Sequence, residues 1–163
     1  MNANRTKKSS PRRSKAVTQE RLIAARDRNL RQLLLRTTRT LSGSIEEGLI
    51  RRGYGDVRLA HSTFLAHLDL AGNSITQVAE RAQMTKQAAG LLAEELEAMG
   101  YIIRGIDDRD ARARVLTFTE RGRKLLIETL SVIDEIESNY TSALGARTMD
   151  ELRSCLQALQ GLT

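Results

Sequence analysis

Apolar residues recur every three or four positions over most of the chain, which is the spacing of one face of a helix. The first such stretch begins at Thr18 and stops before Gly53 and Gly55, because two glycines so close together rarely continue a helix. This stretch is longer than an ordinary globular helix. The pattern therefore predicts a long or broken helix that packs against a partner.

The next stretch predicts short helices. Apolar positions in residues 64–70 mark the first of them, which is expected to end at Gly72. Ser74 and Gln77 have the S-x-x-Q spacing of a capping box and are expected to start the second. Thr85 follows a tight connection and is a suitable N-cap for the third. Two helices joined by so short a turn are typical of a helix-turn-helix unit.

The third helix is expected to stop at Gly100, since glycine favours the position just after a helix. The spacing of apolar residues then changes from the helical period to that of strands. Residues 101–103 and 115–118 are β-branched or aromatic runs, and the polar, charged residues 105–112 lie between them. These features predict a β-hairpin with a long tip.

The rest of the chain returns to helical spacing. Thr119 can cap a helix that continues to about Leu144, and Gly145 should break it. Thr148 and Glu151 again have the spacing of a capping box and are expected to start a last helix. Its apolar stripe consists of Leu152, Cys155, Leu156 and Leu159.

Composition supports a mainly α fold with a small β-hairpin, in a single domain over residues 17–163. The chain has 163 residues, of which 3% are aromatic, with no tryptophan and one proline. A core of Leu, Ile, Val and Ala suits helices better than a β-sandwich. The chain has no apolar run long enough to cross a membrane, so no membrane partner is expected.

Positive charge is concentrated at the N-terminus. The formal net charge is +6, and residues 1–16 carry six basic side chains and no acidic one, so the remaining residues sum to zero. We expect residues 1–16 to be a disordered basic arm that contacts nucleic-acid phosphates or keeps the protein soluble.

The sequence offers little for metal or catalytic chemistry. His61 and His67 do not share a helical face, and Cys155 is the only cysteine. We therefore expect no metal site, no cofactor and no internal disulfide, and no set of residues that would make the chain an enzyme. Cys155 is expected to be a buried structural thiol within its apolar stripe. A single cysteine suits a reducing compartment, so we expect a cytoplasmic protein.

Residues 74–122 resemble the winged helix-turn-helix of the MarR family of bacterial transcriptional regulators. The resemblance is carried by V-A at 78–79, T-K-Q at 85–87, L-E-A-M-G-Y at 96–101, D-A-R at 110–112 and F-T-E-R-G at 118–122. It implies a lobe over 57–119 that contains the helix-turn-helix and the wing. It also implies that 17–53 and 120–163 form a helical dimerisation region.

The resemblance implies a homodimer that binds double-stranded DNA at a pseudo-palindromic operator, acts as a repressor and responds to a small-molecule effector. Physical reasoning favours the dimer too, since one small recognition helix buries too little surface for tight specific binding. A two-fold dimer places two such helices one DNA turn apart. The alternative is that the apolar stripes pack within one chain.

The start of the recognition helix should face the bases. Gln87 can bond an adenine edge and Lys86 a guanine or a phosphate, or both can be solvated surface residues. Thr85 serves as a cap or contacts a phosphate. Gly90 would let the backbone approach DNA closely. Gly90 and Leu91 stand where the family often has Ser-Arg, so a common arginine contact is absent.

In the wing, Arg112 matches the family arginine that enters the minor groove, which attracts a guanidinium. Asp110 matches the acid that orients this arginine. Arg109 and Arg114 are expected to contact phosphates or to be solvated.

Family effectors generally bind between the dimerisation helices and the DNA-binding lobe. We expect Arg39, Tyr54, His61 and Phe64 to line such a cleft. The leading prediction is thus a sequence-specific regulator. The alternative is a weakly specific, backbone-directed DNA-binding protein of architectural type, favoured by the basic arm and by the missing arginine.

Overall fold

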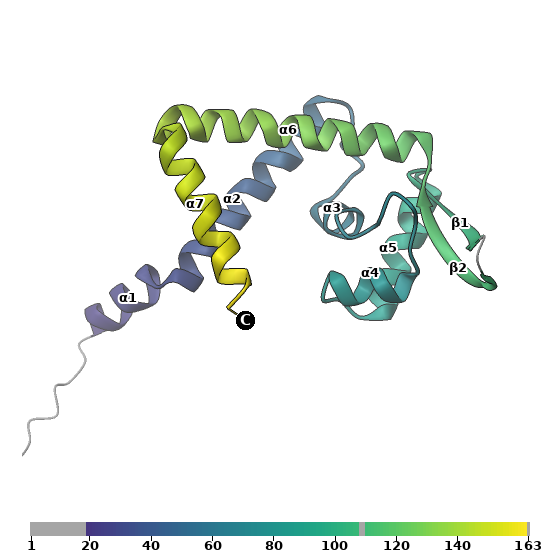
Figure 1. Ribbon diagram of the computed structural model, residues 1–163, viewed down its shortest axis with the longest axis horizontal. Coiled ribbons are helices and arrows are strands. Elements are labelled where there is room, and N and C mark those ends of the chain that lie inside the picture. Colours follow the sequence, from purple (N-terminus) through teal and green to yellow (C-terminus); the bar gives the residue numbers. More distant parts are fainter. Residues whose placement is uncertain (1–18, 108–109, 163) are drawn as a thin grey trace, which may run out of the picture. The chain divides into compact units, whose positions relative to one another are not determined.

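A computed structural model describes residues 19–107 and 110–162 (Figure 1). Within these residues, seven helices and one two-stranded antiparallel hairpin confirm the mainly α class with a small β-hairpin wing. The basic arm at 1–16 and Arg109 lie outside the described residues. The chain divides into two compact units, Met1–Thr38 and Arg39–Thr163. Within the described part, no helix is long and apolar enough to cross a membrane.

The described part of the first unit consists of α1 (Gln19–Arg28) and the first turns of α2 (Leu30–Arg51). The long helical stretch is broken at Asn29. The Asn29 side chain accepts a hydrogen bond from the backbone N–H of Gln32 at 3.0 Å and donates to the carbonyl of Ala25 at 3.2 Å. One side chain therefore bonds both helix ends, which gives the break a local cause. The exposed apolar residues of this unit are Leu22, Ile23, Leu30, Leu33, Leu34 and Leu35.

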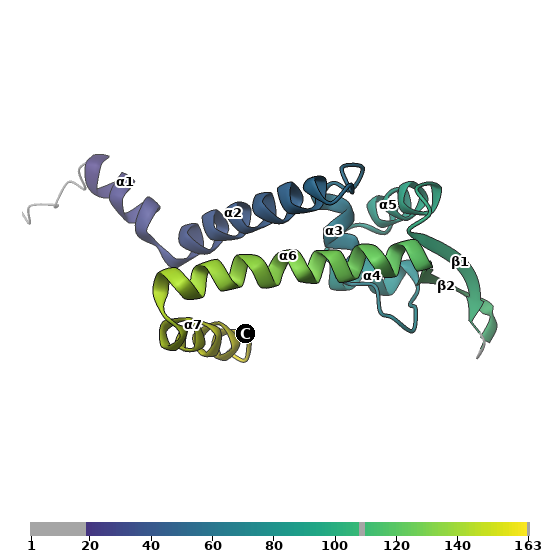
Figure 2. The same cartoon turned by 90° about the horizontal axis from the view of Figure 1, so that it is seen from above.

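The second unit contains the end of α2 and all remaining elements. These are α3 (Leu59–Leu65), α4 (Ile75–Arg81), α5 (Lys86–Ala98), β1 (Ile102–Asp107), β2 (Asp110–Phe118), α6 (Glu120–Leu144) and α7 (Ala146–Gln160). Figure 2 shows α3, α4 and α5 grouped near the start of α6, with the hairpin beside them. Their common core includes Leu49, Phe64, Val78, Leu96, Tyr101 and Leu125.

The end of α2 is attached to α6 within this unit. Gly48 packs so closely on Val132 that an added Cβ would lie 2.5 Å from a methyl of Val132. One turn further, Arg52 makes ion pairs with Glu128 at 3.1 Å and Glu135 at 2.6 Å. A small residue and a charged pair thus fix α2 against the long helix.

Helix α3 lies earlier in the chain than the apolar spacing predicted. It ends at Leu65, and the next residues form tight i→i+3 turns, from His67 N–H to the carbonyl of Phe64 and from Leu68 N–H to the carbonyl of Leu65. Such turns keep apolar side chains near the face that they would occupy in a helix. This is why the apolar spacing predicts a helix over these residues. Leu68 is buried, whereas Leu70 is exposed.

The start of α7 also differs from the prediction. The helix begins at Ala146, directly after Gly145, whose φ of +86° ends α6. Thr148 therefore lies inside the helix and does not cap it. The buried apolar residue of α7 is Met149. Cys155 is exposed, so the expectation of a buried thiol is wrong for this chain, because the rest of the α7 stripe has no cover within it.

The hairpin strands are longer than predicted. They continue to Asp107 and resume at Asp110, so most of the predicted long tip belongs to the two strands. A two-stranded hairpin has faces in water, so charged residues are tolerated there and do not indicate a loop. The register shifts between Ile106 and Asp107.

Candidate nucleic-acid interface

Helices α4 and α5 form the predicted helix-turn-helix. Ser74 and Gln77 make the predicted capping box at the start of α4, with Ser74 N–H donating to the Gln77 side chain at 2.8 Å. The turn is closed by a bond from Met84 N–H to the carbonyl of Ala79 at 2.9 Å. Gln83, in this turn, is the non-glycine residue with positive φ, at 53°, among the described residues. This backbone conformation is rare for residues other than glycine, and here it lies in the tight turn between α4 and α5.

The recognition helix α5 has one buried face and one exposed face. Its N-cap is Thr85, whose hydroxyl accepts a hydrogen bond from Ala88 N–H at 3.1 Å, so the capping interpretation of Thr85 holds. Lys86 and Gln87 are exposed in the first turn, which contains no acidic residue. The positive end of the helix dipole and a lysine therefore lie together at the end that the sequence predicts to face DNA bases. The buried face consists of Ala89, Ala93 and Leu96.

Acidic residues lie in the second half of α5, where they are paired. Glu97 meets Arg104 of β1 at 3.0 Å, and Glu94 lies 3.8 Å from the same guanidinium. Glu95 is bonded to Arg58 and to His61. Ion pairing reduces the repulsion that these carboxylates would otherwise exert on DNA phosphates.

His61 connects α3 to the recognition helix. Its side chain is 2% exposed, and its Nδ1 accepts a hydrogen bond from Arg58 N–H at 3.2 Å. This pattern assigns the proton to Nε2, which donates to Glu95 at 2.7 Å. The bond from His61, and then that from Arg58, lowers the pKa of the Glu95 carboxyl. The stability this provides is present above the ordinary glutamate pKa and is lost as pH falls through the folded value.

Tyr101 anchors the base of the wing. Its ring is buried, and its hydroxyl donates to Asp56 at 2.8 Å and accepts from Arg121 at 3.1 Å. Burial raises the pKa of the Tyr101 phenol. The Arg121 guanidinium also lies 4.6 Å from the centre of the Tyr101 ring. The start of α6 is therefore tied to the start of β1 at the foot of the hairpin.

The hairpin carries the predicted wing residues. Asp110 and Arg112 lie in β2, where the register shifts, and Asp110 pairs with Asp107. Arg114 pairs with Ile106, and its side chain is exposed. On the other side of β2, Asn73 exchanges two backbone hydrogen bonds with Leu116, which attaches the loop before α4 to the wing.

Solved structures share this architecture. The chain matches CouR from Rhodococcus jostii RHA1, bound to p-coumaroyl-CoA, with a TM-score of 0.66 and 22% identity over 82% of this chain and 92% of that one. It matches a MarR-family regulator from Rhodococcus sp. RHA1 with a TM-score of 0.65 and 22% identity, over 81% and 92% of the two chains. The chain has the fold of the MarR family. A MepR mutant from S. aureus bound to an oligodeoxyribonucleotide also matches, with a TM-score of 0.53 and 21% identity over 83% and 99% of the chains.

The likeness to MarR proteins is one of structure. No protein-family model matches the sequence, and no curated protein matches it. Within the described residues, no group of three or more His, Cys, Asp or Glu is placed to hold a metal ion.

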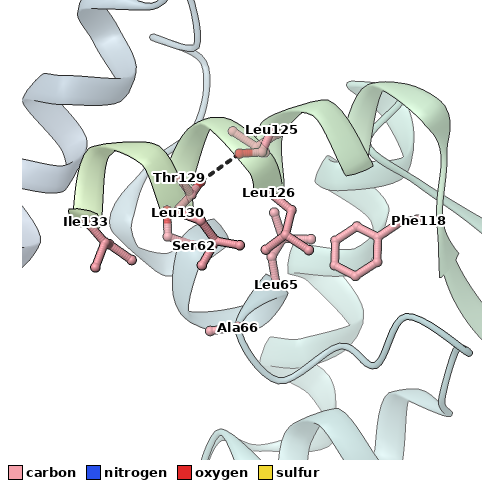
Figure 3. A pocket seen from close by; sticks show the side chains of 9 residues that line it. All are labelled: Ser62, Leu65, Ala66, Phe118, Leu125, Leu126, Thr129, Leu130 and Ile133. Atoms are coloured by element: carbon pink, nitrogen blue, oxygen red, sulfur yellow. Dashed lines mark hydrogen bonds between the residues drawn. The ribbon is translucent and has the colours of Figure 1, made fainter. Parts of the chain in front are cut away.

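The MarR fold of this chain has a partly open, apolar pocket between α3 and α6 (Figure 3). Its volume is about 260 Å³. The pocket is lined by Ser62, Leu65, Ala66, Phe118, Leu125, Leu126, Thr129, Leu130 and Ile133. The hydroxyl of Thr129 donates to the carbonyl of Leu125 at 2.8 Å. The lining therefore has two hydroxyl groups and no charged side chain.

The four residues predicted for an effector cleft do not line this pocket. Phe64 and His61 are buried, the former in the core and the latter against Glu95. Tyr54 packs against the core with its ring centre 6.4 Å from that of Tyr101, and Arg39 is exposed. The pocket itself carried no signal in the sequence, because apolar residues that line a cavity have the same spacing as those that fill a core.

Proposed function

We propose that this chain is a sequence-specific DNA-binding transcriptional regulator that acts as a homodimeric repressor. The observation that carries the proposal is the exposed first turn of α5, which presents Lys86 and Gln87 and contains no acidic residue. The hairpin that follows this helix in the chain bears Arg112 and Arg114. Both side chains of that turn can bond base edges in the major groove. The neighbour bound to an oligodeoxyribonucleotide supports the same use of this fold.

Exposed apolar stripes support the dimer. In the first unit, leucines such as Leu33 and Leu34 are 51% and 40% exposed. In the second, Leu152, Leu156 and Leu159 of α7 are exposed along one side of a helix. Monomeric proteins rarely leave such stripes in water. A second copy of the chain would cover them and place two recognition helices on one operator.

The proposal is tested by selecting bound fragments from sheared genomic DNA of the source organism at about 150 mM salt, where nonspecific binding is weak. A specific dimeric regulator enriches a few palindromic sites, which identify the genes it controls. Enrichment of no particular sequence, together with a steep dependence of affinity on salt, would instead favour the backbone-directed, weakly specific binder.

Arg112→Ala is expected to weaken binding to a selected site by about 1–3 kcal/mol while the dimer stays intact. The reason is that a guanidinium in a narrow minor groove gains from its negative potential. Arg112→Lys keeps the charge but not the planar donor group, so it should recover part of the loss. A DNA titration measures the affinity, and sedimentation of the same variants measures whether the dimer persists. Equal affinity of the alanine variant and the parent would remove the wing from the mechanism.

We propose the α3–α6 pocket as the effector site, in place of the cleft predicted from the sequence. Its lining favours an uncharged, largely apolar ligand, because a buried charge without a partner is costly. The uncharged fluorophore N-phenyl-1-naphthylamine should therefore brighten on binding. Ala66→Leu, at the C-cap of α3, should fill the pocket and abolish the signal, whereas Ala60→Leu, in α3 but outside the lining, should retain it. Equal signals from both variants would place the probe elsewhere.

A further inference from the structure

Two neighbouring residues on α5 have no explanation within the folded chain. Gly90 lies inside the helix, where glycine is less stable than alanine, yet an added Cβ would meet nothing within 4 Å. Leu91 is apolar but 57% exposed. Neither packing nor a turn within the described residues requires these residue types, so both are free to contact an external partner.

Both residues continue the surface that should face DNA. In a helix, residues four apart lie on the same face, so Gly90 follows Lys86 and Leu91 follows Gln87. Lys86 and Gln87 are exposed in the first turn. In the next turn the surface becomes acidic at Glu94, which is paired with Arg104. The bare glycine and the exposed leucine thus occupy the second turn of the same face.

A DNA major groove suits this arrangement better than a protein surface. One leucine beside a lysine and a glutamine buries too little apolar area to hold a protein partner. The major groove offers one apolar group among its polar base edges, the C5-methyl of thymine. A side chain at position 90 would hold the helix away from the groove, whereas glycine allows a close approach.

We propose that Leu91 is a specificity-determining residue that contacts the C5-methyl group of a thymine, and that Gly90 gives the helix the clearance for this contact. The inference rests on the proposed DNA-binding function. It replaces the polar arginine readout that the resemblance implies with an apolar readout.

The experiment replaces each thymine of a selected site, one at a time, with deoxyuridine, which removes the methyl group and leaves base pairing intact. At one position in each half-site, affinity should fall about fourfold, the equivalent of one buried methyl group. Leu91→Ala should bind thymine and uracil at that position equally. Gln87→Ala, the matched control on the same face, should bind more weakly but keep the thymine preference.

Gly90→Ala supplies an independent readout. Alanine should raise the melting temperature, because it favours the helix and meets no clash, and yet weaken DNA binding. A higher melting temperature together with weaker DNA binding would show that the added methyl group blocks the approach to DNA and does not impair folding. If uracil is tolerated at every thymine of a site that the parent binds, or if Leu91→Ala keeps the thymine preference, the contact is refuted while the DNA-binding function stands. A parent chain that enriches no site would refute both.

Discussion

Gly122→Ala is expected to lower the free energy of unfolding by about 3 kcal/mol, the upper end of the range for overpacking. Gly122 is buried in the first turn of α6. An added Cβ would lie 2.0 Å from the carbonyl oxygen of Tyr101 and 3.1 Å from Cδ1 of Phe118. That carbonyl accepts the N–H of Thr119 at 3.1 Å, so moving it away would break the junction between wing and helix.

Urea denaturation of the parent and the variant measures this loss. Gly105→Ala is the matched control, since a Cβ at Gly105 of β1 meets nothing within 4 Å. The control should change the unfolding free energy by less than about 0.5 kcal/mol, as for other surface substitutions. If the two alanine variants unfolded at the same urea concentration, the close contact between α6 and Tyr101 would be wrong.

The same junction explains a motif that the sequence could only offer as a resemblance. The Thr119 hydroxyl accepts the N–H of Gly122 at 3.0 Å and donates to the carbonyl of Gly100 at 2.6 Å. Threonine is needed for the cap, and glycine is needed for the close approach to the carbonyl of Tyr101. The T-x-x-G spacing at 119–122 therefore joins the wing to the long helix.

Features set by neighbouring residues were predictable. The caps at Ser74, Thr85 and Thr119 all form, because a cap needs a side chain and a backbone N–H only a few residues apart. The Thr148–Glu151 pair has the same spacing and fails as a cap. Gly145 ends α6 and starts α7 at once, so Thr148 is already inside the helix. A capping motif forms a cap only where its first residue lies at the start of a helix.

Features that join distant residues were not predictable. The sequence identified Lys86 and Gln87 as exposed candidates, but not that Glu95 is bonded to Arg58 and His61, which lie more than thirty positions earlier. Pairing of the acids depends on how α3 and β1 pack on α5. The sequence shows charge along the helix but not which charges are already neutralised.

Phe64→Ala is expected to lower the free energy of unfolding by about 3–5 kcal/mol, the usual cost of removing a buried aromatic ring from a core. Phe64 is 0% exposed and belongs to the core cluster between α3, α5 and the wing strands. The variant would leave a cavity that the closely packed surroundings fill only in part. Ile103→Ala, at a side chain that is 54% exposed, should cost far less.

Phe64→Leu distinguishes a core residue from the effector-lining residue that the sequence predicted. Leucine keeps most of the apolar volume, so a core role predicts that it recovers most of the stability lost in Phe64→Ala, in a urea titration. The naphthylamine signal should then be the same in Phe64→Leu and in the parent, because Phe64 is not part of the α3–α6 lining. A leucine variant that is stable but has lost the signal would return Phe64 to the effector site.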